Sequence, residues 1–230
     1  MEHRFLVEIM GPAGSGKSTL VRALCAQDDR VVAGLDLAKM RYVRPLLRKL
    51  GVFFPVWLRN HREDRWLDRR EIRSIARLET WSQALDAQRK SDQPVTLFDH
   101  GPLYRLARFR EFGPALTHSE PFQRWWHDSL SWWHDSLDLV VCLEAPDEVL
   151  LRRVEERGHW YLSGSHSSEE KHDFLARYRR AFDEILQRRD SHVPKVLRIR
   201  SDEKSVDEIA AEVLAAFRFT PGRSSKGTVQ

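Results

Sequence analysis

Five short runs of apolar and β-branched residues divide the chain, and longer stretches with apolar residues at helical spacing lie between them. The runs cover residues 4–10, 31–36, 95–99, 138–143 and 194–200. Nearly continuous apolar runs of this length are typical of parallel strands that are covered on both faces. Helices are predicted at 69–91, 102–112, 119–137, 147–158, 168–190 and 205–217. This alternation predicts a doubly wound α/β domain.

The stretches outside this pattern indicate how the chain is divided into a domain, a helical region and a tail. The segment 37–91 is dense in arginine and aromatic residues, so we expect helices there that overhang one side of the sheet and bind a second substrate. The tail 220–230 has little to bury and is expected to be disordered. A length of 230 residues suits one domain, which we place at residues 1–219.

A short repeat lies within the predicted helix 119–137. The sequence Trp-Trp-His-Asp-Ser-Leu occurs at 125–130 and again at 132–137. Two helical turns separate the copies, so the tryptophan pairs recur on nearly the same face. His127 and His134 would stand roughly 10 Å apart along the helix axis, too far to share one metal ion. We interpret the helix as part of the core or as a subunit contact through which the chain forms a homodimer.

Charge and cysteine content limit the partners and the cellular compartment that we expect for the chain. Lysine and arginine outnumber aspartate and glutamate by 38 to 34, and this mild, dispersed excess does not indicate a nucleic-acid partner. The two cysteines lie in apolar runs, which argues against a disulfide framework and favours the cytoplasm. The N-terminus has no signal-peptide pattern and no apolar run is long enough to span a bilayer, so we expect no membrane partner.

The strongest signal in the chain is the glycine-rich segment that follows the first apolar run. Its spacing, G-x-x-x-x-G-K-S, is that of the phosphate-binding P-loop, and a predicted helix follows it. The predicted nucleotide-binding residues are Gly11, Pro12, Ala13, Gly14, Ser15, Gly16, Lys17, Ser18 and Thr19. The alternative is a glycine turn beside a surface lysine, which the coincidence of strand, glycines, lysine and serine disfavours.

The chemistry of this loop indicates what it binds. Glycines allow consecutive backbone N–H groups to turn around an anion, and the following helix adds its unpaired N–H groups and the positive end of its dipole. Lys17 is expected to reach the β- and γ-phosphates, and the Ser18 hydroxyl is expected to bind Mg²⁺. The predicted cofactors are therefore ATP and Mg²⁺.

Two aspartates end predicted strands, where ligands gather in a sheet of this type. Asp99 is expected to order the magnesium shell or to accept the proton of an attacking hydroxyl. Asp36 is the competing general base. For each aspartate the alternative is an N-cap of the helix that follows, and the sequence leaves the choice of base open.

Arginines form a third group of candidates. Arg153 and Arg157 lie four residues apart and share a helix face, next to a loop at 159–168. Guanidinium groups stabilise the charge that spreads over a migrating phosphoryl group, so we assign both arginines to catalysis. Arg177 or Arg180, across the loop, is a weaker candidate for the same role.

With these residues in place, the chain resembles the nucleoside-monophosphate-kinase-like group of P-loop kinases, which includes thymidylate, cytidylate, shikimate and gluconate kinases. The resemblance covers most of residues 4–217. It rests on the P-loop, on the strand that ends at Asp99, on Leu143-Glu-Ala-Pro146 with the helix after it, and on Phe174 to Phe182, which is similar to the helix after a thymidylate kinase lid.

The resemblance implies a three-layer P-loop NTPase fold with a five-stranded parallel sheet in the order 2-3-1-4-5 and helices on both faces. It implies a helical lid at about residues 150–170, an acceptor site at 37–91, and a position near adenine for residues 201–205. The chain departs from thymidylate kinases at His100, where they place an arginine. This departure favours an uncharged hydroxyl acceptor, and the position of Asp36 is similar to that of an aspartate in shikimate kinase and chloramphenicol phosphotransferase.

The leading hypothesis is therefore an ATP-dependent kinase that transfers the γ-phosphoryl group to a small-molecule acceptor, preferably to a hydroxyl. The alternative within this class is a nucleoside monophosphate kinase. A P-loop ATPase or GTPase would need a water-positioning residue, a sensor element or an Asn-Lys-x-Asp motif, and none is visible. A polynucleotide kinase has only the arginine content in its favour.

Overall fold

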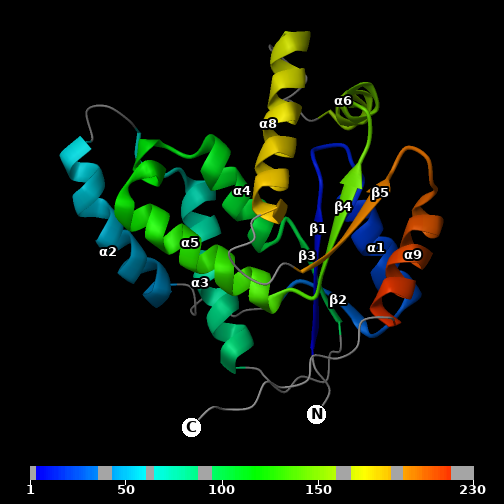
Figure 1. Ribbon diagram of the computed structural model, residues 1–230, viewed down its shortest axis with the longest axis horizontal. Helices are drawn as coiled ribbons and strands as arrows, with labels where there is room; N and C mark the ends of the chain where they lie inside the picture. The colour runs from blue at the N-terminus through cyan, green and yellow to red at the C-terminus, as the bar shows by residue number, and fades with distance from the viewer. Residues whose placement is uncertain are drawn as a thin grey trace.

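Five parallel strands form one sheet in the order β2-β3-β1-β4-β5 (Figure 1), as the resemblance implies. The structure is a computed structural model that describes residues 4–35, 43–60, 65–87, 95–158, 167–187 and 194–218. The strands are β1 (Phe5–Met10), β2 (Val31–Ala33), β3 (Val95–Asp99), β4 (Leu139–Glu144) and β5 (Lys195–Arg200). In the register of the sheet, Val7 of β1 lies between Leu97 of β3 and Leu139 of β4.

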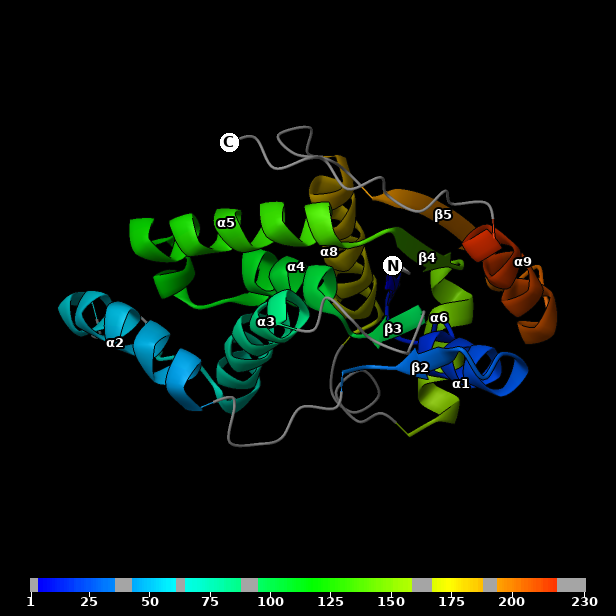
Figure 2. The same cartoon turned by 90° about the horizontal axis from the view of Figure 1, so that it is seen from below.

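Helices cover both faces of the sheet, which gives the three layers that the fold class requires (Figures 1 and 2). One face packs against α1 (Lys17–Gln27) and α9 (Val206–Arg218). The other face packs against a larger layer made of α3 (Arg69–Ala87), α4 (Pro102–Phe112), α5 (Glu120–Ser136) and α8 (Ser168–Gln187). The inner strands are therefore buried on both sides, which explains why they read as continuous apolar runs.

Two further helices complete the described chain. Helix α6 (Asp147–Glu156) follows β4 and contacts α8. Helix α2 (Val43–Asn60) lies outside α3 and α5, at the end of the molecule away from β5 (Figure 2). A 3₁₀ turn at Ala115–His118 joins α4 to α5. Helices α2 and α3 thus occupy the described part of the segment that we expected to form an overhanging helical region.

Strand β2 is shorter than the predicted run 31–36, because it ends at Ala33. Gly34 adopts a positive φ of 73°, which turns the chain away from the strand direction. Several predictions fall outside the described residues: the base Asp36, residues 159–166 of the expected lid, the helix extensions at 88–91 and 188–190, and the tail 220–230. None of the described helices combines the length and apolar character needed to cross a bilayer.

The tryptophan repeat lies in α5 and contributes to the core of the same chain. Trp126 and Trp133, one from each copy, are both 1% exposed. The Trp126 indole N–H donates to the Leu106 carbonyl at 2.9 Å, so its polar atom is satisfied inside the core. Trp133 packs edge-on against Phe98 of β3, with ring centroids 5.8 Å apart. This packing supports the core interpretation, while the homodimer stays a prediction.

Candidate functional site

The P-loop connects β1 to α1, and its glycines have backbone angles that other residues rarely adopt. Gly11, Gly14 and Gly16 have φ values of 149°, 82° and 94°. A Cβ atom on Gly11 would lie 2.6 Å from the Leu143 carbonyl oxygen, and one on Gly14 would lie 2.5 Å from the Leu150 carbonyl oxygen. Side chains at these two positions would therefore collide with β4 and α6. The loop holds the shape of an anion cradle, with the first turn of α1 behind it.

The side chain of Lys17 folds back over the loop. Its Nζ donates to the carbonyl oxygens of Gly11 at 2.9 Å and Pro12 at 2.8 Å, and the residue is 7% exposed. Burial lowers the pKa of Lys17 to about 8, the charge of Asp99 opposes this change, and Arg157 adds to it. The ammonium group is thus held at the loop by two carbonyl dipoles. These dipoles compensate its charge only in part, and a bound phosphate would compensate it more fully.

Asp99 lies at the end of β3, within reach of the first turn of α1. The Ser18 hydroxyl donates to Asp99 Oδ2 at 2.6 Å, and His100 Nδ1 lies 3.0 Å from Oδ1. Burial alone would raise the pKa of Asp99, but hydrogen bonds from His100 and Ser18, together with the charge of Lys17, hold it below its ordinary value. A serine hydroxyl beside an ionised carboxylate is the pair of oxygen donors that Mg²⁺ prefers. The two predicted magnesium ligands are therefore adjacent and chemically suited to that ion.

The alternative role of Asp99, as the cap of the next helix, does not fit the geometry. Helix α4 begins after Gly101, and no side chain from the preceding turn caps it. The cap comes instead from β1, where the Glu8 carboxylate accepts the N–H groups of Leu103 and Tyr104, both at 2.8 Å. A Cβ atom on Gly101 would lie 2.7 Å from the Glu8 Cδ, so only glycine lets α4 approach β1 this closely.

Glu8 is fully buried, and the sequence analysis did not single it out. Burial raises its pKa to about 8, against the opposing effects of the Tyr104 and Leu103 amides and of the Arg105 charge. Its carboxylate ties the strand before the P-loop to the helix after Asp99. A carboxylate inside an apolar strand was the signal for this residue, because burying one is costly unless it has partners.

Both the P-loop and α4 open onto one cavity of about 960 Å³. Nine cationic side chains line it, with only three carboxylates. The cations are Lys17, Arg70, Arg73, Arg77, Arg105, Arg108, Arg157, Lys171 and Arg177. We call this space the P-loop cavity. Its lining carries a larger positive excess than the formal charge of +4 of the whole chain.

Five of these cations come from α3 and α4: Arg70, Arg73, Arg77, Arg105 and Arg108. None of the five forms an ion pair with a carboxylate in the part of the chain that the structure describes. The spacing of three and four residues on α3 places its three arginines on one face. We call these residues the α3–α4 arginines. This spacing was visible in the sequence, within the segment assigned to the acceptor.

Arg105 is the most buried member of this group, at 9% exposure. Its Nη1 donates to the Ser74 hydroxyl at 3.0 Å, and its guanidinium lies 5.3 Å from the centre of the Trp81 ring. Its Nε has no hydrogen-bond partner among the residues that the structure describes. Burial lowers the pKa of Arg105 to about 10, the charge of Arg77 adds to this, and Glu8 opposes it. A buried guanidinium crowded by a second arginine indicates a place where an anion binds.

The structure separates the arginines predicted from the sequence. Arg157 lines the P-loop cavity, as does Arg177, which is paired with Glu111 at 2.7 Å. Arg153 instead lies behind the loop, donating to the Ser201 carbonyl at 2.8 Å and its hydroxyl at 3.1 Å. It thereby joins α6 to the turn after β5. Arg180 is exposed and does not line the cavity.

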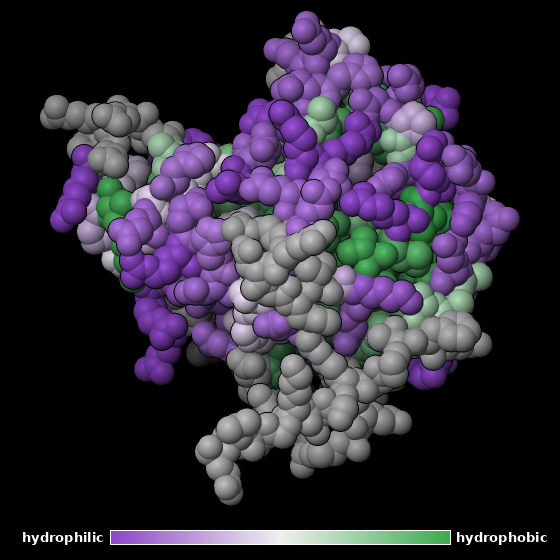
Figure 3. Space-filling model, in the orientation of Figure 1, coloured by the Kyte–Doolittle hydropathy of each residue, from purple (hydrophilic) through white to green (hydrophobic). Residues whose placement is uncertain are grey.

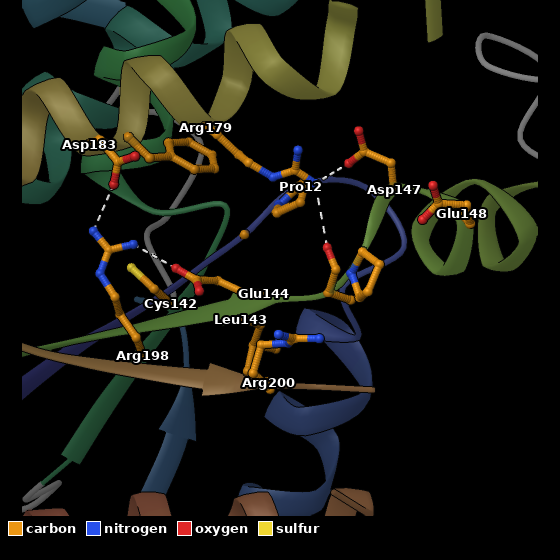
Figure 4. A pocket seen from close by; sticks show the side chains of 14 residues that line it. Pro12, Cys142, Leu143, Glu144, Asp147, Glu148, Arg179, Asp183, Arg198 and Arg200 are labelled. Atoms are coloured by element: carbon orange, nitrogen blue, oxygen red, sulfur yellow. Dashed lines mark hydrogen bonds and ion pairs between the residues drawn. The ribbon is translucent and has the colours of Figure 1, made fainter. Parts of the chain in front are cut away.

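A second cavity of about 430 Å³ lies on the other side of Pro12, between β4, β5 and α8 (Figure 4). Most of its charged groups form ion pairs with one another, while Arg200 pairs with Asp202 and Glu203 outside the lining. Arg198 lies between Glu144 at 2.5 Å and Asp183 at 2.7 Å, and Arg179 points to Asp147 and to the Ala145 carbonyl (Figure 4). We call this space the paired cavity. Because its arginines all have carboxylate partners, we place the site in the P-loop cavity.

Comparisons with known proteins agree with this geometry. A family profile described as "AAA domain" matches residues 7–172, which is more than half of the chain. No curated protein matches the sequence significantly.

Several solved structures share the fold over almost their whole length. The YorR protein from Bacillus subtilis, in complex with phosphorylated GDP, has a TM-score of 0.52 and 17% identity, over 93% of this chain and 95% of that one. Deoxyadenosine kinase from M. mycoides with bound dCTP has a TM-score of 0.51 and 13% identity, over 92% and 100% of the two chains. At such low identity these likenesses establish the fold of a P-loop kinase and nothing finer.

Proposed function

The chain belongs to the AAA domain family, and we propose that it is a phosphotransferase that moves the γ-phosphoryl group of Mg-ATP to a small anionic acceptor. The observation that carries this proposal is the P-loop cavity, where the α3–α4 arginines face the phosphate loop without carboxylate partners in the described chain. Phosphoryl transfer needs positioned positive charge more than covalent chemistry from the protein, and this cavity supplies it.

The residues of the P-loop would bind the donor. The backbone N–H groups of Gly11 to Thr19 and the Lys17 ammonium would bind the triphosphate, while Ser18 and Asp99 would hold Mg²⁺. The ion supplies charge neutralisation at the phosphates when it is bound. The lowered pKa of Asp99 keeps it ionised at neutral pH, which suits a cation ligand better than a general base. Asp36 remains the alternative base, outside the described residues.

Arg157 and Lys171 would serve the transferred group. Both line the P-loop cavity, Arg157 directly after the end of α6 and Lys171 on α8, where its Nζ also pairs with Glu155 at 2.9 Å. Arg157 is near enough to Lys17 to lower its pKa. We therefore assign Arg157 to the migrating phosphoryl group, where charge develops during the reaction. The hydrogen bonds of Arg153 support a different role, which is to hold the P-loop in place through Ser201 and Gly14.

The α3–α4 arginines would bind the acceptor. An uncharged alcohol would leave these five arginines without an ion-pair partner among the described residues, whereas an anionic acceptor would supply one. This consideration revises the expectation of an uncharged acceptor that His100 suggested. The reactive atom can still be a hydroxyl, provided that the same molecule carries a phosphate or carboxylate.

One further observation favours a nucleoside monophosphate as the second candidate acceptor. Four aromatic side chains line the P-loop cavity together with the arginines: Tyr104, Phe112, Phe174 and Tyr178. The rings of Tyr104 and Tyr178 are nearly parallel, with centroids 5.8 Å apart. A planar base beside such rings and a phosphate on the arginines would use both features of the cavity.

A transfer assay with γ-labelled ATP and a panel of acceptors tests the proposal. The panel contains nucleoside monophosphates, sugar phosphates, hydroxy acids and uncharged alcohols. We expect label on an anionic acceptor only, and its position on a phosphate or on a hydroxyl distinguishes the two candidates. Transfer to uncharged alcohols alone would contradict the acceptor class, and nucleotide binding without transfer to any acceptor would contradict the enzymatic function.

A further inference from the structure

Helix α2 carries an exposed apolar stripe that the nucleotide chemistry does not use. Leu47, Phe54 and Leu58 are 62%, 49% and 52% exposed. They are separated by seven and four residues, so they lie on one face of the helix. Val52 is also exposed, at 50%, but lies roughly 140° around the helix axis from Leu47 and outside this stripe. In Figure 3, apolar surface shows among hydrophilic groups at the α2 end of the molecule. Large apolar side chains gathered in this way mark a surface that contacts something else.

The charges on α2 all have the same sign. The 18 residues of the helix contain Arg44, Arg48, Lys49 and Arg59 and no aspartate or glutamate. Lys49 faces inward and pairs with Glu79 at 3.5 Å. The three arginines are exposed and form no ion pair with any described carboxylate. At 3.6 residues per turn they lie roughly 60–120° around the helix axis from Leu47, so they flank the apolar stripe on one side.

The opposite side of α2 fixes the helix to the molecule. Phe53 is 1% exposed and packs against Phe122 and Trp125 of α5, with ring centroids 5.1 Å and 5.7 Å away. The stripe therefore belongs to a helix that is anchored by its own core contacts and faces outward at the end of the molecule (Figure 2). No described residue of α2 lines the P-loop cavity, so a partner on this stripe would not occupy the nucleotide site.

The charge pattern selects among partners for this face. In a symmetric contact between two copies of α2, arginines would meet arginines with no acidic residue on either helix to compensate. An anionic lipid surface satisfies both features, because leucine and phenylalanine enter the acyl boundary while arginines bind headgroup phosphates. We propose that α2 docks the chain on anionic membranes, lying in the interface plane without crossing it. This proposal departs from the expectation of no membrane partner, which rested on the lack of a signal-peptide pattern and of an apolar run long enough to span a bilayer.

Vesicle binding by the full chain tests this inference. We expect sedimentation with vesicles of phosphatidylcholine and phosphatidylserine, and little with phosphatidylcholine alone. Binding should weaken as salt is raised, because salt screens the arginines. The double variant Arg44→Gln, Arg48→Gln should lose roughly fivefold in partitioning per arginine. The triple variant Leu47→Gln, Phe54→Gln, Leu58→Gln should lose binding, since nothing apolar then enters the bilayer.

Exposed residues were chosen so that the variants keep their fold, which circular dichroism verifies. The matched control is Arg152→Gln with Arg180→Gln, which removes two charges from exposed positions on α6 and α8 and should bind like the wild type. Four outcomes would overturn the inference: no vesicle binding, equal binding to neutral vesicles, binding that survives the triple variant, or a concentration-dependent dimer that the triple variant abolishes. The last result would assign the stripe to a second copy of the chain.

Discussion

The two cavities beside the P-loop are lined by similar types of charged residue but differ in whether those charges are paired. Both are lined by arginines and carboxylates, and both touch the loop. In the paired cavity, Arg198 and Arg179 each have a carboxylate within ion-pair distance (Figure 4). In the P-loop cavity, the α3–α4 arginines have none among the described residues.

The difference shows how to tell a structural cluster of charges from a binding site. Charges that form ion pairs largely cancel one another, so they connect helices and strands and have little affinity left for a charged ligand. Arg198, for example, joins β5 to β4 and α8. Arginines that lie near one another without carboxylate partners still have N–H groups that can bind an anion. Arg105 is in addition buried, and its Nε has no hydrogen-bond partner among the described residues. If this reasoning is right, equal substitutions in the two cavities must have unequal effects.

The largest effect is expected from Lys17→Ala. This change removes the ammonium group that donates to the Gly11 and Pro12 carbonyls, so phosphoryl transfer should fall by about a thousandfold or more. Circular dichroism and thermal unfolding should still report a folded chain. Steady-state transfer of label from ATP measures the loss, and turnover within a few-fold of the wild type would contradict the role of Lys17.

The second-largest loss of kcat is expected from a substitution of Asp99, with Asp147 in the paired cavity as its matched control. Asp99→Asn should lower kcat by about a hundredfold, because the amide is a weaker ligand for Mg²⁺ than the carboxylate. Asp147→Asn changes the same atoms in the paired cavity, where it breaks contacts with Arg179 and His172. It should leave kcat within about twofold and affect stability only. Equal losses of kcat in the two variants would break the comparison.

Single α3–α4 arginines should act on the acceptor rather than on ATP. Arg77→Gln or Arg108→Gln should raise the KM for the anionic acceptor by about tenfold and leave the KM for ATP unchanged. The control in the paired cavity is Arg198→Gln, which should alter neither constant. A rise in the KM for ATP alone would move these arginines to the donor site.

The pH dependence of nucleotide binding sharpens the role of Lys17. Burial lowers its pKa to about 8, so the ammonium loses its proton, and its charge, as the pH rises through that value. Affinity for Mg-ATP should therefore fall by up to about tenfold per pH unit above pH 8. Lys17→Arg stays charged throughout this range and should remove the dependence, even if it binds more weakly. A flat profile for the wild type would contradict the lowered pKa.

Glu8→Gln is expected to have the smallest effect on turnover. Above its pKa of about 8 the Glu8 carboxylate accepts both hydrogen bonds from α4, whereas the amide in Glu8→Gln has one oxygen that accepts and one N–H group that does not. The free energy of unfolding should fall by about 1–3 kcal/mol, as measured by urea denaturation. Because α4 carries Arg105, the KM for the acceptor should rise slightly while nucleotide binding is unchanged. Unaltered stability would mean that another group caps α4.

Local patterns in the sequence were sufficient for the fold and for naming the residues of the proposed donor site. The apolar runs define four of the five strands to within a residue at each end, because parallel strands are buried on both faces. The P-loop spacing and the strand end at Asp99 predicted that Ser18 and Asp99 lie side by side, as they do, since strand ends in such a sheet meet at one edge; their binding of phosphate and magnesium stays a prediction. The shortened β2 was missed because the angles of Gly34, which end the strand, are not encoded in hydropathy.

The acceptor side depends on contacts between distant segments. No local pattern links Glu8 to Tyr104, which are brought together only when α4 packs on β1. Arg153 and Arg157 are four residues apart at the end of α6, but only Arg153 hydrogen-bonds to Ser201, which directly follows β5. The pairing of Arg198 with Glu144 and Asp183 likewise joins two strands and a helix. Which arginines are left without partners is therefore a property of the folded chain.

Calorimetric titration with Mg-ATP tests the central claim most directly, because it requires no knowledge of the acceptor. The wild-type chain should bind one nucleotide at the P-loop cavity with measurable heat, and Lys17→Ala should lose that heat while Asp147→Asn, in the paired cavity, should retain it. Absence of binding by the well-folded wild type, or binding that Lys17→Ala leaves intact and Asp147→Asn abolishes, would contradict the account.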